Sequence, residues 1–368
     1  MTGPRRTEPS APPPLPAELD TDEAWELLRT VRTGADAEAV GLREDPDGVW
    51  RWNRDTTPGA RELTDRYLPL CLAGPRLTFA QLGQSLDGFI ATRTGDADYV
   101  TGEEDRRHLH RLRALADAVV VGAGTAVADD PQLTVRACTG AHPVRVVLDP
   151  HRRVPPRRKV FTDGSAPTLW VVCAGGERGH TRADDTIDGS DGSDGADGSD
   201  GSGGSGGAGV VDVLTLPDLA AFAPGNLVRV LARRGLGRVL VEGGGVTVSR
   251  FLSERALHRL YVTVAPVLLG DGVPGLRFAG TPVMRDALRP PVRRAALGED
   301  TLFELDLGTP HPGPPLDGEH PEAGQARRER EDPVHHGDSQ PLGRAEPGGP
   351  EGPGGGALPG TPAADVQR

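Results

Sequence analysis

Short apolar runs alternate with stretches of helical periodicity from residue 76 onward. The apolar runs have the length of buried strands, and the stretch 101–116 places its leucines on one helical face. The pattern predicts strands at 76–82, 117–121, 144–148, 168–173, 210–214, 238–242, 258–265 and 301–307, and helices at 101–116, 226–235 and 246–254. This alternation predicts an α/β fold, a mostly parallel sheet with helices on both faces. Because no long helix separates the closing strands, we expect an antiparallel edge.

Three segments interrupt this pattern with strongly biased compositions. Residues 1–20 are rich in Pro, residues 188–209 contain only Asp, Gly, Ser and Ala, and residues 309–368 are rich in Gly, Pro, Glu and Arg. Such segments cannot bury enough apolar surface to offset the entropy of ordering, so we predict that all three are disordered. The sequence thus predicts one domain at 76–308 with an insertion at 188–209. Residues 21–75 form an N-terminal cap that contains a helix at 22–32.

The overall charge narrows the classes of partner. The chain has 53 acidic and 41 basic residues, a net charge of −12, which disfavours a nucleic acid or an anionic membrane as the main partner. No apolar run reaches the roughly 20 residues that span a bilayer, and no apolar stretch follows the N-terminal arginines. Three isolated cysteines and scattered histidines predict neither disulfides nor a metal site. We therefore expect a cytoplasmic protein without a metal.

Two glycine-rich turns follow predicted strands. The sequence Val239-Leu-Val-Glu-Gly-Gly-Gly-Val246 leads from a strand into a helix, where glycines let a backbone approach a phosphate at the helix N-terminus. A tight turn that needs positive φ is the alternative. The second, Val121-Gly-Ala-Gly-Thr125, begins like a dinucleotide fingerprint but has Val127 at the third glycine position, so an ordinary Rossmann domain is not expected.

A third motif, Asp129-Asp-Pro-Gln-Leu-Thr-Val-Arg136, combines two carboxylates with an arginine. The carboxylates before Pro131 are also typical of a simple turn. Arg113, on the predicted helix 101–116, and Arg136 both lie near glycine-rich turns, and two such arginines suit bidentate binding of a phosphate. As single residues, each is also compatible with a solvated surface position.

In their order, these motifs resemble the pyrimidine reductase family of riboflavin biosynthesis. The resemblance covers about 76–308 and includes Gln84-Ser-Leu-Asp-Gly88, the stretch from Leu112 to Thr125, the 129–136 motif, Val241-Glu-Gly-Gly244 and Ala265-Pro-Val-Leu-Leu-Gly270. It implies a fold like that of dihydrofolate reductase and a stand-alone reductase. The bifunctional relatives carry a zinc deaminase domain in front. Its His-x-Glu and Pro-Cys-x-x-Cys signature is missing here, because His320-Pro-Glu322 has no cysteine after it.

The resemblance also implies the site residues. NADPH is expected to contact Gly83, Tyr99, Thr125, Asp129, Pro150 and the stretch Gly244, Gly245, Val246, Thr247, Val248, Ser249 and Arg250. The substrate is expected to contact Ala97, Arg113, Leu133, Arg136 and Glu242. Two positions depart from the family: Ala97 replaces a common serine, and Gln81 stands where bifunctional members often have lysine. Glu242 and Asp129 are the expected catalytic residues.

The implied reaction reduces the ribosyl group of 5-amino-6-(5-phosphoribosylamino)uracil to ribityl, with hydride delivered to C1′. The proton source is left open between water and a carboxyl group. Relatives suggest a homodimer. The alternatives are a related reductase of a pterin or of a specialised-metabolite pyrimidine, and a nucleotide-binding protein without activity.

Overall fold

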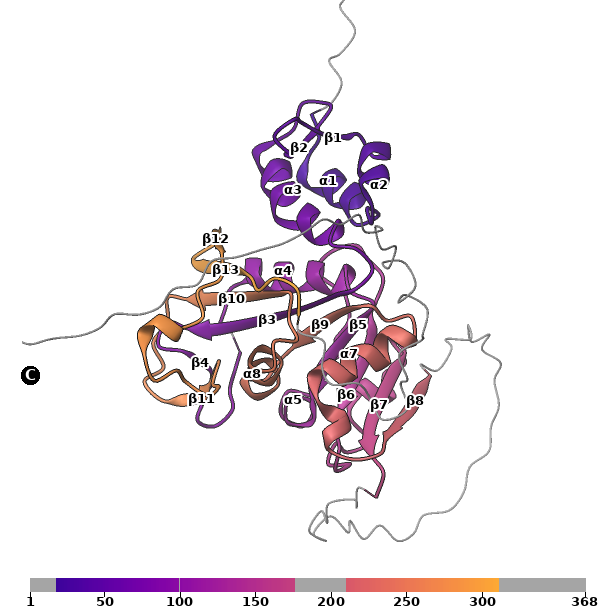
Figure 1. Ribbon diagram of the computed structural model, residues 1–368, viewed down its shortest axis with the longest axis vertical. Helices are drawn as coiled ribbons and strands as arrows, with labels where there is room; N and C mark the ends of the chain where they lie inside the picture. Colours follow the sequence, from indigo (N-terminus) through magenta and orange to yellow (C-terminus); the bar gives the residue numbers. More distant parts are fainter. Residues whose placement is uncertain (1–17, 99, 176–209, 311–368) are drawn as a thin grey trace, which may run out of the picture. The chain divides into compact units, whose positions relative to one another are not determined.

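A nine-stranded sheet forms the centre of the computed structural model, which describes residues 18–98, 100–175 and 210–310 (Figure 1). The strand order is β12-β13-β10-β3-β9-β5-β6-β7-β8. All pairs from β10 to β8 are parallel, whereas β10–β13 and β12–β13 are antiparallel. The strands span β3 Leu77–Ser85, β5 Ala118–Gly122, β6 Val144–Leu148, β7 Thr168–Cys173, β8 Val211–Leu216, β9 Arg238–Glu242, β10 Arg259–Ala265, β12 Val292–Leu297 and β13 Asp300–Asp306. The predicted parallel sheet with an antiparallel edge is confirmed.

Helices cover both faces of this sheet, because successive strand residues alternate between two apolar clusters. Along β3, Leu77 and Phe79 join one cluster, whereas Ala80 and Leu82 join the other. The first cluster includes residues of α4 Glu103–Ala114, α5 Ala123–Ala128 and α6 Lys159–Thr162; the second includes residues of η1 Ala220–Phe222, α7 Pro224–Arg233 and α8 Gly245–Ser253. The predicted two-faced packing is therefore confirmed.

The N-terminal cap shares the first of these clusters. It contains α1 Thr21–Leu28, α2 Gly34–Ala39, β1 Leu42–Glu44, β2 Trp50–Trp52 and α3 Pro58–Cys71. Trp25 Nε1 donates to Thr139 O at 2.8 Å, and Tyr67 Oη lies 2.6 Å from His108 Nδ1 on α4. Leu19 is fully buried and Asp20 caps α1, so these two residues of the 1–20 segment belong to the ordered cap.

The predicted ends of two helices differ from those in the structure. The predicted helix 22–32 ends at Leu28, because Thr33 begins a new helix with a capping box of its own. The predicted helix 101–116 runs from Glu103 to Ala114. Gly102 is its N-cap, and the Gly102 backbone N–H donates to the Asp300 carboxylate at 2.7 Å. A side chain from a distant strand thus contacts the start of this helix.

Several elements escaped prediction. They are the 14-residue helix α3 and the shorter elements α2, α5, α6, β4 Phe89–Thr92, β11 Gly272–Pro274, β12, η1, η2 Met284–Asp286 and the strands of the cap. The 188–209 insertion and the segment 311–368 lie outside the described residues. Among the described residues, none of the helices combines the length and the apolar character needed to cross a bilayer.

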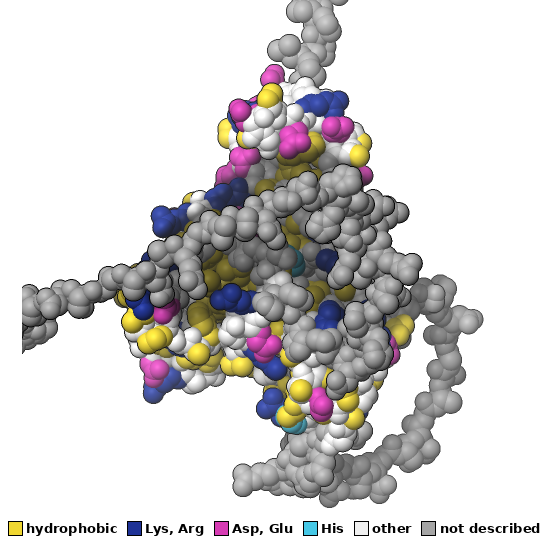
Figure 2. Space-filling model, in the orientation of Figure 1, with side chains coloured by type: hydrophobic (Ala, Val, Ile, Leu, Met, Phe, Trp, Pro, Cys, Tyr) yellow, Lys and Arg dark blue, Asp and Glu magenta, His cyan; other side chains and the backbone are white. Residues whose placement is uncertain are grey.

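Charge on the described surface is mixed. On the face drawn in Figure 2, Lys and Arg side chains lie among acidic, polar and apolar ones rather than in one continuous basic patch.

Candidate active site

The carboxyl ends of neighbouring parallel strands bring the predicted site residues to one edge of the sheet. Gly83 lies near the end of β3, Glu242 ends β9, Gly122 ends β5, and Asp149 follows β6. In the register of β3 and β9, Gln81 pairs with Glu242. The edge outside the carboxyl ends of parallel strands is where open α/β sheets bind ligands.

The two glycine turns pack directly against each other. Thr125 Oγ1, on α5, accepts a hydrogen bond from Gly244 N at 2.9 Å. A Cβ at Gly243 would lie 2.7 Å from Thr125 Cγ2, and Gly243 has a φ of 86°. A Cβ at Gly245 would lie 2.1 Å from Gly275 O. Close packing and positive φ therefore account for these glycines, as the alternative prediction of a tight turn proposed.

Helix α8 begins directly after this turn. Its N-cap, Gly244, offers no side-chain hydrogen bond to the first turn. Val246 is exposed, whereas Val248 and Ser249 are buried, and Ser249 Oγ accepts from Arg277 N at 2.7 Å. Arg250 is bonded to Glu254 at 3.2 Å. Within the predicted stretch 244–250, the backbone of the first turn is thus the part available to a ligand.

Arg113 and Glu242 form a buried ion pair. Arg113 Nη2 lies 2.8 Å from Glu242 Oε1, and Arg113 Nε donates to the same oxygen at 2.9 Å. Their side chains are 8% and 6% exposed. Arg113 Nη1 donates to Thr134 O at 2.8 Å. The sequence predicted two independent substrate ligands, but the structure makes them partners, so Arg113 holds the Glu242 carboxylate in one orientation.

Arg136 is held differently. It is exposed, and its Nη1 donates to Thr134 Oγ1 at 2.6 Å, while its backbone N donates to His110 Nδ1 at 2.8 Å. Leu133 is buried and has a φ of 55°, an uncommon conformation for leucine. The loop that carries Arg136 thus meets the Arg113–Glu242 pair at Thr134, and Arg136 keeps an accessible guanidinium.

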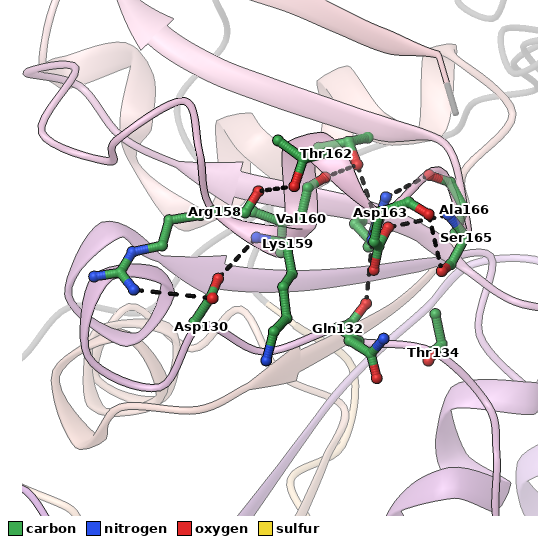
Figure 3. A network of polar contacts seen from close by, with 12 residues as sticks. Asp130, Gln132, Thr134, Arg158, Lys159, Val160, Thr162, Asp163, Ser165 and Ala166 are labelled. Atoms are coloured by element: carbon green, nitrogen blue, oxygen red, sulfur yellow. Dashed lines mark hydrogen bonds and ion pairs between the residues drawn. The ribbon is translucent and has the colours of Figure 1, made fainter. Parts of the chain in front are cut away.

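Asp129 and Asp130 take different roles at the end of α5. Asp130 has a φ of 43°, and its carboxylate accepts from Lys159 N at 2.8 Å and lies 3.9 Å from Arg158 (Figure 3). Asp130 therefore ties the turn to α6. Asp129 is exposed as a residue, yet partial burial of its carboxyl raises its pKa above the ordinary value. Of the two carboxylates, Asp129 is the one left for chemistry.

The turn after β6 is held by hydrogen bonds to the carboxylate of Asp149. Asp149 is fully buried and accepts from Arg153 N at 2.8 Å, Val154 N at 2.9 Å and Trp170 Nε1 at 3.2 Å. The Arg152 guanidinium lies 5.6 Å from the centre of the Trp170 ring, whereas Arg153 is exposed. Asp149 thus shapes the turn; of the two cations after Pro150, Arg152 is half-buried against Trp170 and Arg153 is exposed.

Two residues that were predicted to contact ligands precede α4. Ala97 is exposed, and its carbonyl accepts from Val100 N at 3.4 Å. Tyr99 lies outside the described residues.

Sequence reasoning missed a buried polar cluster beside Gly83. Asp105, on α4, is 3% exposed and accepts from Gln81 Nε2 at 3.2 Å and from Thr263 Oγ1 at 2.6 Å. A Cβ at Gly83 would lie 3.3 Å from Asp105 Oδ2. An acidic residue in the first turn of a helix is ordinarily read as a response to the helix dipole, so the sequence held no signal for this contact.

Comparisons with known proteins agree with this geometry. The chain is 30% identical over 246 residues to the riboflavin biosynthesis protein RibD of Aquifex aeolicus (strain VF5), covering 66% of this chain and 61% of that protein. It is 34% identical over 234 residues to the 2,5-diamino-6-ribosylamino-4(3H)-pyrimidinone 5′-phosphate reductase of Methanothermobacter thermautotrophicus, covering 61% of this chain and 94% of that protein.

Among solved structures, Acinetobacter baumannii RibD (form 1) aligns with a TM-score of 0.48 and 23% identity, over 74% of this chain and 67% of that one. The chain spans only 61% and 51% of the RibD proteins of Aquifex aeolicus and Bacillus amyloliquefaciens. A family model described as the RibD C-terminal domain matches residues 76–287, more than half of the chain. The chain therefore belongs to the RibD C-terminal domain family.

Proposed function

We propose that this protein reduces the ribosyl group of 5-amino-6-(5-phosphoribosylamino)uracil to ribityl with NADPH, as a step of riboflavin biosynthesis. The observation that carries the proposal is the Arg113–Glu242 ion pair, which meets the Arg136 loop at Thr134 beside the two glycine turns. The name of the Methanothermobacter relative, a pyrimidinone phosphate reductase, supports this reaction class, and the name of the Aquifex relative supports the pathway.

The residues present fit a phosphorylated dinucleotide. The uncapped first turn of α8 supplies backbone N–H groups for a pyrophosphate, and Thr125 fixes Gly244 at its start. Arg152 and Arg153 follow Pro150 and are the cations that we assign to the 2′-phosphate. NADPH would supply hydride to C1′ of the substrate, and the task of the protein is to align that carbon and hold both substrate ends.

The other end of the site fits a phosphoribosyl pyrimidine. We assign the substrate phosphate to the exposed guanidinium of Arg136. Glu242 is fixed by Arg113 and can accept hydrogen bonds from hydroxyl groups of the sugar. Asp129, with its raised pKa, lies at the end of α5, on the cofactor side of this arrangement.

The reaction is tested by following NADPH oxidation with two substrates. One is the phosphoribosylaminouracil, and the other is the 2,5-diamino-6-ribosylamino-4(3H)-pyrimidinone 5′-phosphate named for the Methanothermobacter relative, which matches over 94% of its length. We expect higher kcat/KM with the uracil. A preference for the diamino compound would assign the second substrate, and no turnover with either would contradict the proposal.

Cofactor choice has its own test. We expect kcat/KM with NADPH to exceed that with NADH, and the Arg152→Ala/Arg153→Ala double substitution to reduce the preference. Arg250→Ala tests the next candidate cation, although Arg250 is paired with Glu254. Equal use of both cofactors by the wild type would refute the NADPH assignment. A preference for NADPH that survives the double substitution would show that other residues bind the 2′-phosphate.

The substrate end is tested by Arg136→Ala. Loss of a charge-assisted contact costs about 1.5–3 kcal/mol, which corresponds to a substrate KM raised roughly 10- to 150-fold. NADPH affinity should change little. A collapse of NADPH binding instead would show that the two ends of the site are reversed.

We further infer a cytoplasmic homodimer, as the resemblance to the reductase family suggests. The three cysteines lie in described regions and are free, which agrees with a reducing compartment. Analytical ultracentrifugation of the full chain gives the oligomeric state directly, and a monomer at micromolar concentration would refute the dimer.

A further inference from the structure

Two buried carboxyl groups, Glu242 at the end of β9 and Asp105 on α4, have different surroundings. Glu242 is paired with the Arg113 guanidinium, a permanent cation. Asp105 is instead bonded by the Gln81 amide and the Thr263 hydroxyl and lies near the Thr101 hydroxyl, all of them neutral. Pairs of titratable groups with opposed environments are how proteins keep one carboxyl ionised and another protonated.

The surroundings of Asp105 favour its neutral form. Strand β3 presents Gln81 and Gly83, β10 presents Thr263, the turn before α4 presents Thr101, and β13 presents Asp300. Of these groups, Asp300 alone has an ionisable side chain, and that side chain is acidic. Burial first, and then the Asp300 carboxylate, raise the pKa of Asp105, while the neutral hydrogen bonds oppose this.

Asp105 also has a route to the site. Thr101 packs on Gly83, where a Cβ would lie 3.2 Å from Thr101 Oγ1. Thr101 also lines a cavity of about 440 Å³, together with Gly102, Glu103, Arg106, Arg107 and Ala137. Thr101 therefore lies near the buried carboxyl and also borders a cavity that includes Ala137, the neighbour of the residue that we assign to the substrate phosphate.

Thr101 Oγ1 and Asp105 Oδ2 lie 3.2 and 3.3 Å from the same point, the position of a Cβ at Gly83. We propose that Asp105 supplies, through the neighbouring Thr101 hydroxyl, the proton that the substrate nitrogen takes up during reduction. The inference rests on the proposed function. When C1′ of the open-chain C1′=N group receives hydride from NADPH, which is oxidised to NADP⁺, the π pair moves to nitrogen. The nitrogen takes the Thr101 hydroxyl proton, the Thr101 oxygen takes the Asp105 proton, and Asp105 is left as a carboxylate that water reprotonates.

The test is the pH profile of kcat/KM in the wild type and in Asp105→Asn. Because the protonated carboxyl is the active form, wild-type activity should fall as pH rises through the pKa of Asp105. Asp105→Asn should lower kcat roughly 10²-fold or more and remove this alkaline limb. Its NADPH Kd should stay near the wild-type value, which also shows that the variant is folded. An unchanged limb in Asp105→Asn would overturn the proposal.

Three further variants separate a proton supply from a merely structural role. Thr101→Val should lower kcat as Asp105→Asn does, and Thr101→Ser should restore it. Asp300→Asn keeps an acceptor for Gly102 N but removes a negative charge, so the limb should move to lower pH. Asp129→Asn is the matched carboxyl variant. Loss of the limb in Asp129→Asn, but not in Asp105→Asn, would overturn the assignment to Asp105.

Direct titration distinguishes this inference from the proposed function. In ¹³C-aspartate-labelled protein, the carboxyl signal missing from Asp105→Asn should titrate above the ordinary range of aspartate. An active wild type whose Asp105 titrates in the ordinary range or below would overturn the inference and leave the function standing. A wild type that reduces neither pyrimidine phosphate would overturn both.

Discussion

At the scale of single residues, Arg113 was predicted to bind substrate, but in the structure it forms a buried ion pair with Glu242. It lies 129 positions before Glu242, and their buried contact neutralises both charges. Desolvation of two ions is costly, so such a pair adds little stability as a whole. Removing one partner is costly, however, because the other charge is then buried without compensation.

We therefore expect Arg113→Ala to lower the free energy of unfolding by about 3–5 kcal/mol. Arg107→Ala is the control, because Arg107 lies 2.8 Å from Glu104 in an exposed pair, where the loss should be about 0–1 kcal/mol. Urea unfolding of both variants measures the difference. Equal losses in the two would mean that the buried pair is not held as described.

Two buried histidines of α4 make stability depend on pH. Burial lowers the pKa of His108 well below its usual value, and burial, with Arg113 and Arg136 nearby, lowers that of His110 to about 4. The unfolded chain takes up protons below about pH 6.5, whereas the folded state does not. Stability is therefore present above that pH and is lost as the pH falls toward 4.

The expected slope is at most about 1.4 kcal/mol per pH unit for each histidine. Urea unfolding between pH 7.5 and 4.5 measures it, and His108→Gln should reduce the loss. His151→Gln is the control, because His151 is exposed. A stability that stays constant down to pH 4.5 would contradict the buried neutral state of both histidines.

At the scale of elements, α5 and α8 are joined through one hydroxyl. Thr125 accepts from the backbone N–H of Gly244, so the first turn of α5 sets the position of the glycine turn that begins α8. The preceding strands, β5 and β9, are neighbours in the sheet, which brings the two turns together. Cofactor binding, as proposed, depends on this contact rather than on either turn alone.

Thr125→Val removes the acceptor at nearly constant volume. Because Gly244 N then loses its partner, we expect about 1–3 kcal/mol less stability and a KM for NADPH raised several-fold, with substrate KM little changed. Thr125→Ser keeps the hydroxyl and should behave like the wild type in steady-state kinetics. If Thr125→Ser fails as strongly as Thr125→Val, packing by the methyl group is the cause.

At the scale of the whole molecule, the biased insertion falls in a crossover connection. Strands β7 and β8 are parallel neighbours, so the chain from Cys173 to Val211 must return along the sheet. Parallel strands need a dozen or more residues for such a connection. The connection here has 37 residues, and removal of 188–209 leaves 15.

Deleting 188–209 should therefore leave the melting temperature and turnover nearly unchanged. Deleting 181–209 leaves eight residues, too few for the crossover, and should lower the melting temperature by separating β8 from the sheet. Thermal unfolding and turnover of the two deletions test this contrast. Loss of folding in the shorter deletion would show that 188–209 carries structure.

Much of the fold was predictable because its long elements carry strong periodicity. Strands β3, β5 to β10 and β13 and helices α4, α7 and α8 lie near their predicted ranges, whereas the 14-residue helix α3 was missed. The short pairs β1–β2 and β4–β11 were not predictable, because three or four residues carry no usable pattern.

The residue order alone thus determined the sheet, its covering helices and the group of side chains at its carboxyl edge, because these follow from local periodicity and from strand direction. Only the tertiary structure decided how the charges are shared among them. It gave Glu242 an arginine and Asp105 neutral partners, and it gave Gly102 the Asp300 carboxylate as a cap. The physical reason is that burial and pairing set the state of a charge, and both depend on residues far apart in the sequence.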